Sequence, residues 1–308
     1  MSPKASPPVE VQIGERTLRL TNLDKVFYPE AGFTKGQMID YYTRIAPVLL
    51  PHLKDRPLTL KRYPDGIEGQ MFYEKNCPKH RPPWIETATV WSHGNNRDMY
   101  YCLVQDLASL VWVAQLGTVE LHTSLSLASK LPEPRMLVFD LDPGPPATIV
   151  LCCRVALWLR EWFGAHGLQS FCKTSGSKGL QMYIPLNRDV DYEHTKLISK
   201  ALAQSFERDH PEHVVHRQLK TLREGRVLID WSQNDEYKTT VNVYSMRARA
   251  RPTVSTPVTW AEVEECFESE DQDLLVFRAA DVLERVERLG DIFQPVLELQ
   301  QTLPETVD

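Results

Sequence analysis

The sequence predicts an α+β fold in which mixed and antiparallel sheets are flanked by helices. From residue 135 onward, strand-like apolar runs alternate with two long helical patterns and then follow one another directly. The first 130 residues contain mostly short apolar runs of strand length, with only two helical patterns among them. A composition of 42% hydrophobic and 25% charged residues is typical of an ordinary globular protein.

The N-terminal half contains clear local signals for its elements. Apolar and polar side chains alternate on both sides of Gly14, which is typical of a β-hairpin. Thr34 and Gln37 have the spacing of a capping box and predict the start of a helix, and Gly117 is placed to end a second helix. The expected elements are a hairpin at 9–22, helices at 34–53 and 106–117, and strands at 57–63, 70–75, 86–91, 99–104 and 118–122.

The C-terminal half alternates strands with helices. A closing helix is expected to begin after Thr259, because threonine is favoured at helix N-caps. The segment before it, residues 249–260, has the composition of a linker. The elements expected before the linker are strands at 135–142, 170–175, 180–185, 226–231 and 238–244, and helices at 147–167 and 192–209.

Charge is distributed unevenly along the chain. The formal net charge is −6, but residues 261–308 hold 14 acidic residues against 3 arginines. Residues 1–260 therefore carry a net charge of +5, and a basic face for nucleic acid is not excluded. No run approaches the roughly 20 apolar residues of a membrane span. The first ten residues also lack the apolar core of a signal peptide, so we expect a cytoplasmic protein.

None of the six cysteines forms a CxxC pair. Cys152 and Cys153 lie in an apolar run, where buried free thiols are common. Cys77 and His80 could supply two zinc ligands, but no second pair at a fitting spacing follows, so we expect no zinc site. We expect reduced cysteines, in agreement with a cytoplasmic location.

Two aspartates stand at the end of an apolar run, in the stretch RMLVFDLDPG (135–144). Side chains at positions i and i+2 of a strand share one face, so Asp140 and Asp142 would project together. Two close carboxylates destabilise each other unless a cation lies between them, and hard oxygen ligands favour Mg²⁺ or Mn²⁺. The sequence Asp142-Pro143-Gly144 is equally typical of a surface turn. This motif by itself leaves both interpretations open.

Two further patterns favour the metal interpretation. The stretch KTSGSKG (173–179) combines small residues with two lysines, and its backbone amides, Ser175 and Lys178 could hold an anion, although an ordinary hairpin has the same composition. Asp230 ends another apolar run and follows a basic stretch, residues 217–226. Such a stretch is more commonly a solvated helix face. Three carboxylates beside phosphate-binding cations are nevertheless what two-metal nucleotidyl transfer requires.

Four ordered motifs resemble the polymerase domain of bacterial and archaeal DNA ligase D. They are LVFDLDPG, KTSGSKGL, LIDWSQN followed by YKTT, and RPTVSTPVTW, and the similarity begins at LTNLDKVFYPEAGFTKG. That family belongs to the archaeo-eukaryotic primase superfamily and serves non-homologous end joining. The resemblance implies a primase-polymerase domain over residues 1–260, with 1–130 binding DNA ends and 131–260 forming the catalytic core. Residues 261–308 would be an acidic helical segment packed on the same domain.

The resemblance also implies catalytic and nucleotide-binding roles. Asp140, Asp142 and Asp230 match catalytic carboxylates that bind metal ions. Without the resemblance, His122 would be interpreted as a hydrogen-bonded histidine at a strand end. The residues that match the nucleotide site are Lys61, His122, Ser175, Lys178, Arg223, Lys238 and Arg247.

Four other residues match positions that contact DNA. Lys25 and Lys35 match a pair that binds the 5′-phosphate on the far side of a gap, a point-like dianion that suits lysine. Phe72 or Tyr73 matches an aromatic residue that stacks on template bases. The sequence does not decide between the two aromatics.

One position departs from the family pattern. The residue after SGSKGL is commonly histidine in similar sequences, and here it is Gln181. Glutamine can donate a hydrogen bond, but it cannot carry a proton's charge near neutral pH. We therefore expect nucleotide addition to be weakened or retuned rather than lost, and Gln181→His to raise its rate.

The resemblance thus implies a DNA-directed DNA/RNA polymerase that fills short gaps with two Mn²⁺ or Mg²⁺ ions and prefers ribonucleotides. The expected partners are DNA bearing a 5′-phosphate at gaps or short overhangs, NTP or dNTP, a DNA ligase and Ku, with no membrane. The alternatives are a primer-independent primase and a non-catalytic module that binds DNA ends. A pure binder gains nothing from three carboxylates beside DNA, and a sugar-nucleotide transferase would leave Lys25 and Lys35 without a role.

Overall fold

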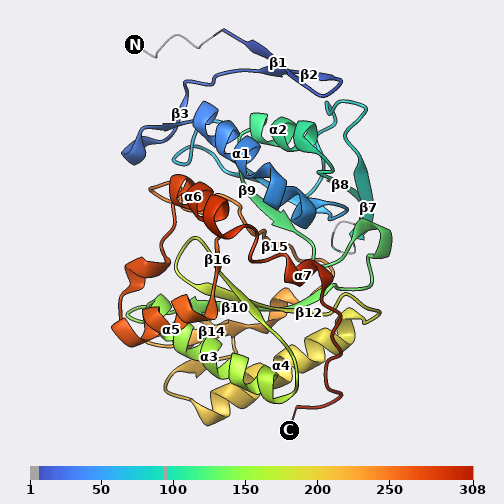
Figure 1. The fold of residues 1–308 in the computed structure, drawn as a ribbon. Helices are drawn as coiled ribbons and strands as arrows, with labels where there is room; N and C mark the ends of the chain where they lie inside the picture. The colour runs from blue at the N-terminus through green and yellow to red at the C-terminus, as the bar shows by residue number, and fades with distance from the viewer. Residues whose placement is uncertain (1–6, 93, 95, 308) are drawn as a thin grey trace. The chain divides into compact units, whose positions relative to one another are not determined.

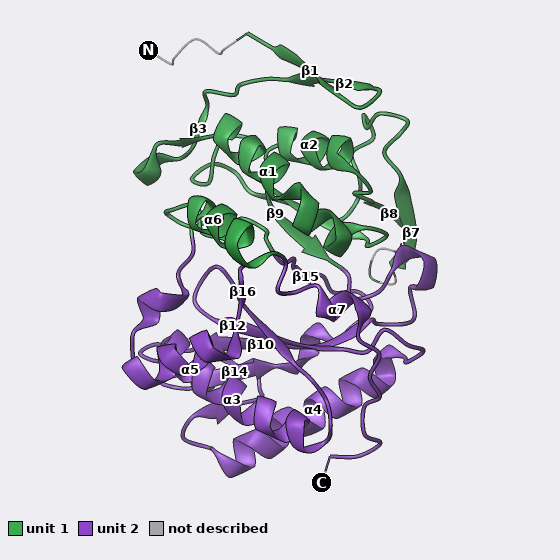
Figure 2. Cartoon of the chain, viewed as in Figure 1, with its two compact units in different colours: residues 1–123, 244–254, 278–290 green, residues 124–243, 255–277, 291–308 purple. Residues whose placement is uncertain are grey.

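The computed structural model describes residues 7–92, 94 and 96–307, and its chain divides into two compact units (Figure 2). Unit 1 comprises residues 1–123, 244–254 and 278–290. Unit 2 comprises residues 124–243, 255–277 and 291–308. The chain therefore returns to unit 1 twice, whereas the sequence analysis places boundaries near residues 130 and 260.

Unit 2 contains a six-stranded sheet in the order β13-β14-β10-β12-β11-β16 (Figure 1). Its neighbours are antiparallel except for the parallel pair β13 and β14, so the sheet is mixed, as predicted. The strands are β10 (Met136–Pro143), β11 (Phe171–Thr174), β12 (Leu180–Pro185), β13 (Val214–Val215), β14 (Val227–Asp230) and β16 (Pro257–Val258).

The interpretation of residues 249–260 as a linker is confirmed only in part: the segment runs from unit 1 into unit 2, but its residues 257 and 258 form a strand of the central sheet. Cys172 and Lys173 of β11 pair with Val258 and Pro257, which form the edge strand β16. Pro257 suits an edge because proline has no N–H to donate to a further strand. The composition that suggested a linker therefore belongs to the margin of the central sheet.

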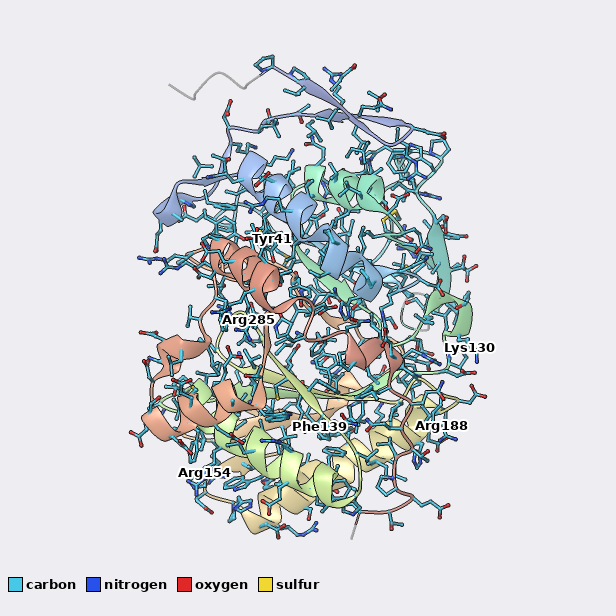
Figure 3. The ribbon with its side chains drawn as sticks, in the orientation of Figure 1. Tyr41, Lys130, Phe139, Arg154, Arg188 and Arg285 are labelled. Atoms are coloured by element: carbon cyan, nitrogen blue, oxygen red, sulfur yellow. A yellow bond between two sulfur atoms is a disulfide. The ribbon has the colours of Figure 1, made fainter. Side chains whose placement is uncertain are left out.

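Helices α3 and α4 cover one face of this sheet (Figure 1). Phe139 of β10, labelled in Figure 3, is fully buried on that face, and its ring centroid lies 5.9 Å from that of Phe163 in α3. Because side chains alternate along a strand, Asp140 and Asp142 project from the other face. The remaining elements of the unit are α3 (Ile149–Ala165), α4 (Tyr192–Asp209), α5 (Trp260–Ser269), α7 (Pro295–Glu298) and β15 (Thr240–Val241).

Asn234 completes the hydrogen bonding of β10 beside the aspartates. β14 ends at Asp230, opposite Asp140, so it does not extend along the earlier residues of β10. The amide of Asn234 takes that place: Val138 N donates to its Oδ1 at 2.9 Å, and its Nδ2 donates to Val138 O at 2.7 Å. Leaving a buried polar group unsatisfied costs about 1–3 kcal/mol, so this side chain stabilises the strand that carries the aspartates.

Unit 1 contains a sheet whose strands are ordered β9-β5-β8-β7, with β6 paired to β5. The predicted capping box is confirmed: Thr34 accepts a hydrogen bond from Gln37 N, and the Gln37 side chain accepts one from Thr34 N. The elements are β1 (Val9–Ile13), β2 (Arg16–Leu20), β3 (Val26–Tyr28), β4 (Phe33–Thr34), α1 (Lys35–Leu53), β5 (Leu58–Arg62), β6 (Phe72–Glu74), β7 (Thr87–Ser92), β8 (Arg97–Cys102), α2 (Leu107–Gln115), β9 (Thr118–Thr123) and α6 (Ala279–Leu289). None of the helices in the described ranges is long and apolar enough to cross a membrane.

Buried tyrosine hydroxyls attach residues 244–254 to unit 1. Tyr41 of α1, labelled in Figure 3, donates to Tyr244 O at 2.8 Å. Tyr28 of β3 donates to Arg247 O at 2.9 Å. These bonds satisfy phenol groups that burial would otherwise make costly, and they fix the backbone of Arg247, one of the residues expected to bind nucleotide.

The prediction that the cysteines are reduced is wrong for one pair. Cys77 and Cys102 form a disulfide with a Cα–Cα distance of 5.0 Å. Strand β8 brings them together, because Cys77 N donates to Tyr100 O at 2.6 Å. The two cysteines are 25 positions apart, and the sequence between them holds no local signal of this contact. Four buried cysteines are free, as predicted: Cys152, Cys153, Cys172 and Cys266.

Candidate active site

A row of polar side chains crosses the face of the unit 2 sheet that lies opposite the helices. Asp140 of β10 is paired with Asp230 of β14 on one side and with Gln181 of β12 on the other. Gln181 is paired in turn with Lys173 of β11. Directly opposed residues of an antiparallel pair project from the same face, and Asp142 lies two residues along β10 on that face. The fold therefore gathers all three predicted metal-binding carboxylates.

The environment of Asp140 fits a cation. Burial, with the nearby Asp142 and Asp230 carboxylates, raises the pKa of Asp140 well above its usual range. Oδ1 of Asp140 is among the few buried side-chain atoms of the described residues that lack a hydrogen-bond partner. A buried carboxylate with an unsatisfied oxygen and carboxylate neighbours is costly unless a positive charge compensates it.

The carboxylate of Asp230 accepts hydrogen bonds from uncharged side chains. Its Oδ1 accepts from Ser232 Oγ at 2.5 Å and from Gln218 Nε2 at 3.0 Å, and its Oδ2 accepts from Gln233 Nε2 at 3.2 Å. Among the residues that the structure describes, no three His, Cys, Asp or Glu side chains are arranged so that they could hold one metal ion together. Within the same residues, Oδ2 of Asp230 accepts only the hydrogen bond from Gln233, so it keeps a lone pair with which Asp230 could bind an ion.

Two of the predicted phosphate-binding cations are connected to Asp230 through the same donors. Lys238 Nζ donates to Ser232 Oγ at 2.5 Å, and Arg223 Nη2 donates to Gln218 O at 2.5 Å. Nε of Arg223 is buried and is a second atom of the described set without a partner. These cations are thus held close to the carboxylates and retain hydrogen-bonding capacity for a phosphate.

The KTSGSKG stretch forms a tight turn against β10. Oγ of Ser175 accepts from Ser177 N at 3.2 Å and from Gly179 N at 3.1 Å, so this serine organises the turn itself, while Lys178 is exposed. A Cβ atom on Gly179 would lie 2.1 Å from Leu141 O, far inside van der Waals contact. Only glycine allows the turn to lie this close to the strand that carries the aspartates.

The side chain of Lys173 lies beside Gln181, the residue that replaces the histidine common in similar sequences. Lys173 is fully buried and donates to Gln181 Oε1 at 2.5 Å and to Ser255 Oγ at 2.7 Å. An ammonium group can only donate hydrogen bonds, so the oxygen of the Gln181 amide points toward Lys173. Nε2 of the same amide then donates to Thr240 Oγ1 at 3.2 Å. Lys173 places a basic group beside Gln181, and the gain in rate expected from Gln181→His stays a prediction.

In unit 1, three of the predicted nucleotide-binding residues gather around one carboxylate, Glu120. Its oxygens lie 3.0 Å from Lys61 Nζ, 2.8 Å from His122 Nε2 and 3.2 Å from Arg247 Nε. Lys61 is paired with Glu120 across β5 and β9, and His122 follows two residues along β9 on the same face. The sequence reasoning missed Glu120, although the spacing in VELH places it beside His122.

Phe72 and Tyr73 project from opposite faces of β6, because they are successive strand residues. Tyr73 is paired with Lys61, and its ring centroid lies 5.9 Å from that of His122 in an edge arrangement. Phe72 is paired with Arg62 on the other face. Both aromatics are exposed, but only Tyr73 shares the face of the basic cluster, which makes it the better candidate for stacking on a base.

The two lysines expected to bind a 5′-phosphate are adjacent in unit 1. Lys35 N donates to Lys25 O at 2.8 Å, Lys35 Nζ donates to Thr21 O at 2.9 Å, and Lys25 Nζ donates to Asp65 Oδ1 at 2.6 Å. Burial, together with the charges of Lys25 and Arg62, lowers the pKa of Lys35 to about 8. Lys35 is thus a buried amine beside a second amine, an arrangement that an anion stabilises.

Comparison with known proteins identifies the family. Residues 34–293 match the family model described as LigD, primase-polymerase domain. The chain belongs to the LigD primase-polymerase family. It is 37% identical over 282 residues to the multifunctional non-homologous end joining protein LigD of Mycolicibacterium smegmatis, and 29% identical over 274 residues to the bifunctional LigD of Bacillus subtilis. These matches cover 91% and 89% of this chain.

The fold agrees with a solved member of the LigD primase-polymerase family. The polymerase domain of Mycobacterium tuberculosis ligase D in complex with DNA matches with a TM-score of 0.84 and 37% identity, over 91% of this chain and 98% of that one. The family is one of DNA/RNA nucleotidyltransferases that depend on a divalent metal ion. The chain spans 36% of the M. smegmatis relative and 43% of the B. subtilis relative.

Gly179→Ala tests the close approach of the turn to β10. We expect the added methyl group to displace the Ser175–Gly179 turn from the aspartates and to raise the KM for nucleotide about tenfold or more, read from primer extension at varied nucleotide concentration. Gly164→Ala is the matched control, because a Cβ on Gly164 of α3 meets nothing within 4 Å, and it should leave the KM unchanged. An unaltered KM in Gly179→Ala would contradict the assignment of the turn to the nucleotide site.

Proposed function

We propose that this chain is a template-directed polymerase that fills short gaps at DNA double-strand breaks during non-homologous end joining. The observation that carries the proposal is the row of carboxylates on one sheet face, in which Asp140 and Asp230 oppose each other and Asp142 follows. The cations Arg223 and Lys238 and the turn containing Ser175 and Lys178 belong to the same unit. This combination of residues suits the transfer of a nucleotide from a triphosphate.

In this proposal Asp140, Asp142 and Asp230 hold two Mn²⁺ or Mg²⁺ ions. Bound there, the ions would promote ionisation of the primer 3′-hydroxyl and offset the charge that develops on the triphosphate. The residues of unit 2 proposed to bind and orient the triphosphate are Ser175, Lys178, Arg223 and Lys238. Their donors would replace water around the phosphates and position the α-phosphate for in-line attack. In unit 1, the residues proposed to bind nucleotide are Lys61, His122 and Arg247.

The proposed DNA contacts lie in unit 1. Lys25 and Lys35 bind the 5′-phosphate at the far side of the gap, where the phosphate replaces Asp65 as the partner of Lys25. Tyr73 stacks on a template base. A preference for ribonucleotides, association with a DNA ligase and Ku, and a cytoplasmic location complete the proposal.

A gap-filling assay tests this function directly. Wild-type protein is expected to extend the primer of a gapped duplex, faster with a downstream 5′-phosphate than without one, faster with rNTP than with dNTP, and only with Mn²⁺ or Mg²⁺. Asp140→Ala should abolish extension. Binding to the 5′-phosphorylated gap should stay within about twofold, because Lys25 and Lys35, and not Asp140, are proposed to bind the 5′-phosphate. Extension by Asp140→Ala would refute the metal assignment, and dinucleotide synthesis without a primer would instead support a primase.

Gap recognition should depend on pH through Lys35. Its pKa of about 8 means that Lys35 is charged at pH 7 and loses its proton as the pH rises through this value. A terminal phosphate is already a dianion from pH 7 upward, so the preference for 5′-phosphate over 5′-hydroxyl gaps should fall about tenfold between pH 7 and pH 9.5. Fluorescence anisotropy measures both affinities.

Lys35→Arg is the matched control for this pH dependence, because guanidinium stays charged throughout the range. Its preference for the 5′-phosphate should be constant between pH 7 and pH 9.5. A wild-type preference that is equally constant would show that Lys35 does not contact the phosphate.

A further inference from the structure

Glu120 is a buried carboxylate to which neither the sequence motifs nor the proposed mechanism gives a role. It lies on β9 with 1% of its surface exposed, and it is paired with Lys61 of the neighbouring strand β5. An ionised carboxylate is rarely buried to this extent unless charged groups and hydrogen-bond donors surround it. Burial by itself would raise its pKa, but the hydrogen bond from His122 and the charges of Arg247 and Lys61 hold the pKa of Glu120 well below its usual range. Glu120 is therefore ionised under all physiological conditions.

Both oxygens of Glu120 have partners. Oε1 accepts from Lys61 Nζ at 3.0 Å and from Ala248 N at 3.1 Å. Oε2 accepts from His122 Nε2 at 2.8 Å and lies 3.2 Å from Arg247 Nε. Glu120 thus accepts three hydrogen bonds and forms an ion pair with Arg247. The three side chains come from β5, from β9 and from residues 244–254, so a single carboxylate links three separate parts of unit 1.

We propose that Glu120 is a positioning residue that holds Lys61, His122 and Arg247 as one preorganised basic cluster facing the nucleotide. This inference rests on the proposed function, because all three residues are proposed to bind nucleotide. If the carboxylate were absent, Lys61 and Arg247 would repel each other, and all three side chains would sample many rotamers. Glu120 removes that freedom before the nucleotide arrives, so binding does not have to supply the ordering.

Glu120 also determines which nitrogen of His122 carries the proton. An ionised carboxylate accepts hydrogen bonds but cannot donate them, so the Nε2 of His122 must be protonated. Burial lowers the pKa of His122 despite the opposing effect of Glu120. The imidazole is therefore neutral near pH 7, with its Nδ1 unprotonated, and the cluster presents two cations and one hydrogen-bond acceptor.

Glu120→Gln is the sharpest test, because it keeps the size of the side chain and replaces one accepting oxygen by a donating amide. We expect the KM for nucleotide to rise tenfold or more, while binding to a 5′-phosphorylated gap stays within twofold. Glu74→Gln is the matched control: Glu74 is another sheet carboxylate paired with a cation, Arg62 at 2.8 Å, but it has no contact with the cluster, and its KM should not change.

Nitrogen-15 NMR of the histidine rings gives a readout that a purely structural role would not move. In the folded wild-type protein, His122 should show a protonated Nε2 near neutral pH, and Glu120→Gln should shift this resonance and lower the pKa of His122. An Nδ1-protonated His122 in the wild type would overturn the proposal without any variant. So would an unchanged nucleotide KM in a folded Glu120→Gln protein. Failure of the wild type to extend a gapped primer would instead refute the proposed function and leave the tautomer result standing.

Discussion

The pairing of Asp140 with Asp230 across two antiparallel strands is the constraint on which the site in unit 2 depends. The strand register forces two carboxylates onto one face at the distance of neighbouring strands, with Asp142 two residues away. Such an arrangement costs stability in the absence of a compensating cation, and the raised pKa of Asp140 expresses that cost. Three features limit this cost. Asn234 holds β10 in register, neutral donors stabilise the charge of Asp230 by hydrogen bonds, and Lys173 lies at the end of the same row.

The two units use buried charge in opposite ways. In unit 2, the carboxylates Asp140, Asp142 and Asp230 outnumber the cations of the polar row, so the row has the charge that suits a metal ion. In unit 1, one carboxylate, Glu120, is surrounded by Lys61, His122 and Arg247, so positive charge exceeds negative charge in the cluster and Glu120 limits the repulsion between the two cations.

Local sequence signals predicted the elements well because they act over a few residues. The capping box at Thr34 and Gln37 and the helix at Tyr192–Asp209 are found as expected, and the DxD motif does lie on a buried strand. What the sequence could not reveal depends on contacts between distant residues. The Cys77–Cys102 disulfide, the edge strand β16 and the bonds from Lys173 to Gln181 and Ser255 all arise from strand pairing.

The resemblance supplied the roles of individual site residues, whereas the geometry separates residues that the motifs leave equivalent. Phe72 and Tyr73 are indistinguishable in sequence, but the pleat of β6 places only Tyr73 on the face of Lys61 and His122. Nothing in the sequence separates Glu120 from other acidic residues in strands; the strand register distinguishes it, because it places Lys61 opposite Glu120. Burial and pairing, rather than residue type, identify it.

Direct measurement of bound Mn²⁺ tests the central claim, that Asp140, Asp142 and Asp230 together hold divalent ions. Electron paramagnetic resonance can count the ions bound at equilibrium, in the presence of gapped DNA and a nucleotide that cannot be transferred. The account predicts saturable Mn²⁺ binding to the wild-type protein, weakened at least about tenfold by Asp140→Asn, Asp142→Asn or Asp230→Asn. Equal Mn²⁺ binding by the wild type and all three variants would contradict it.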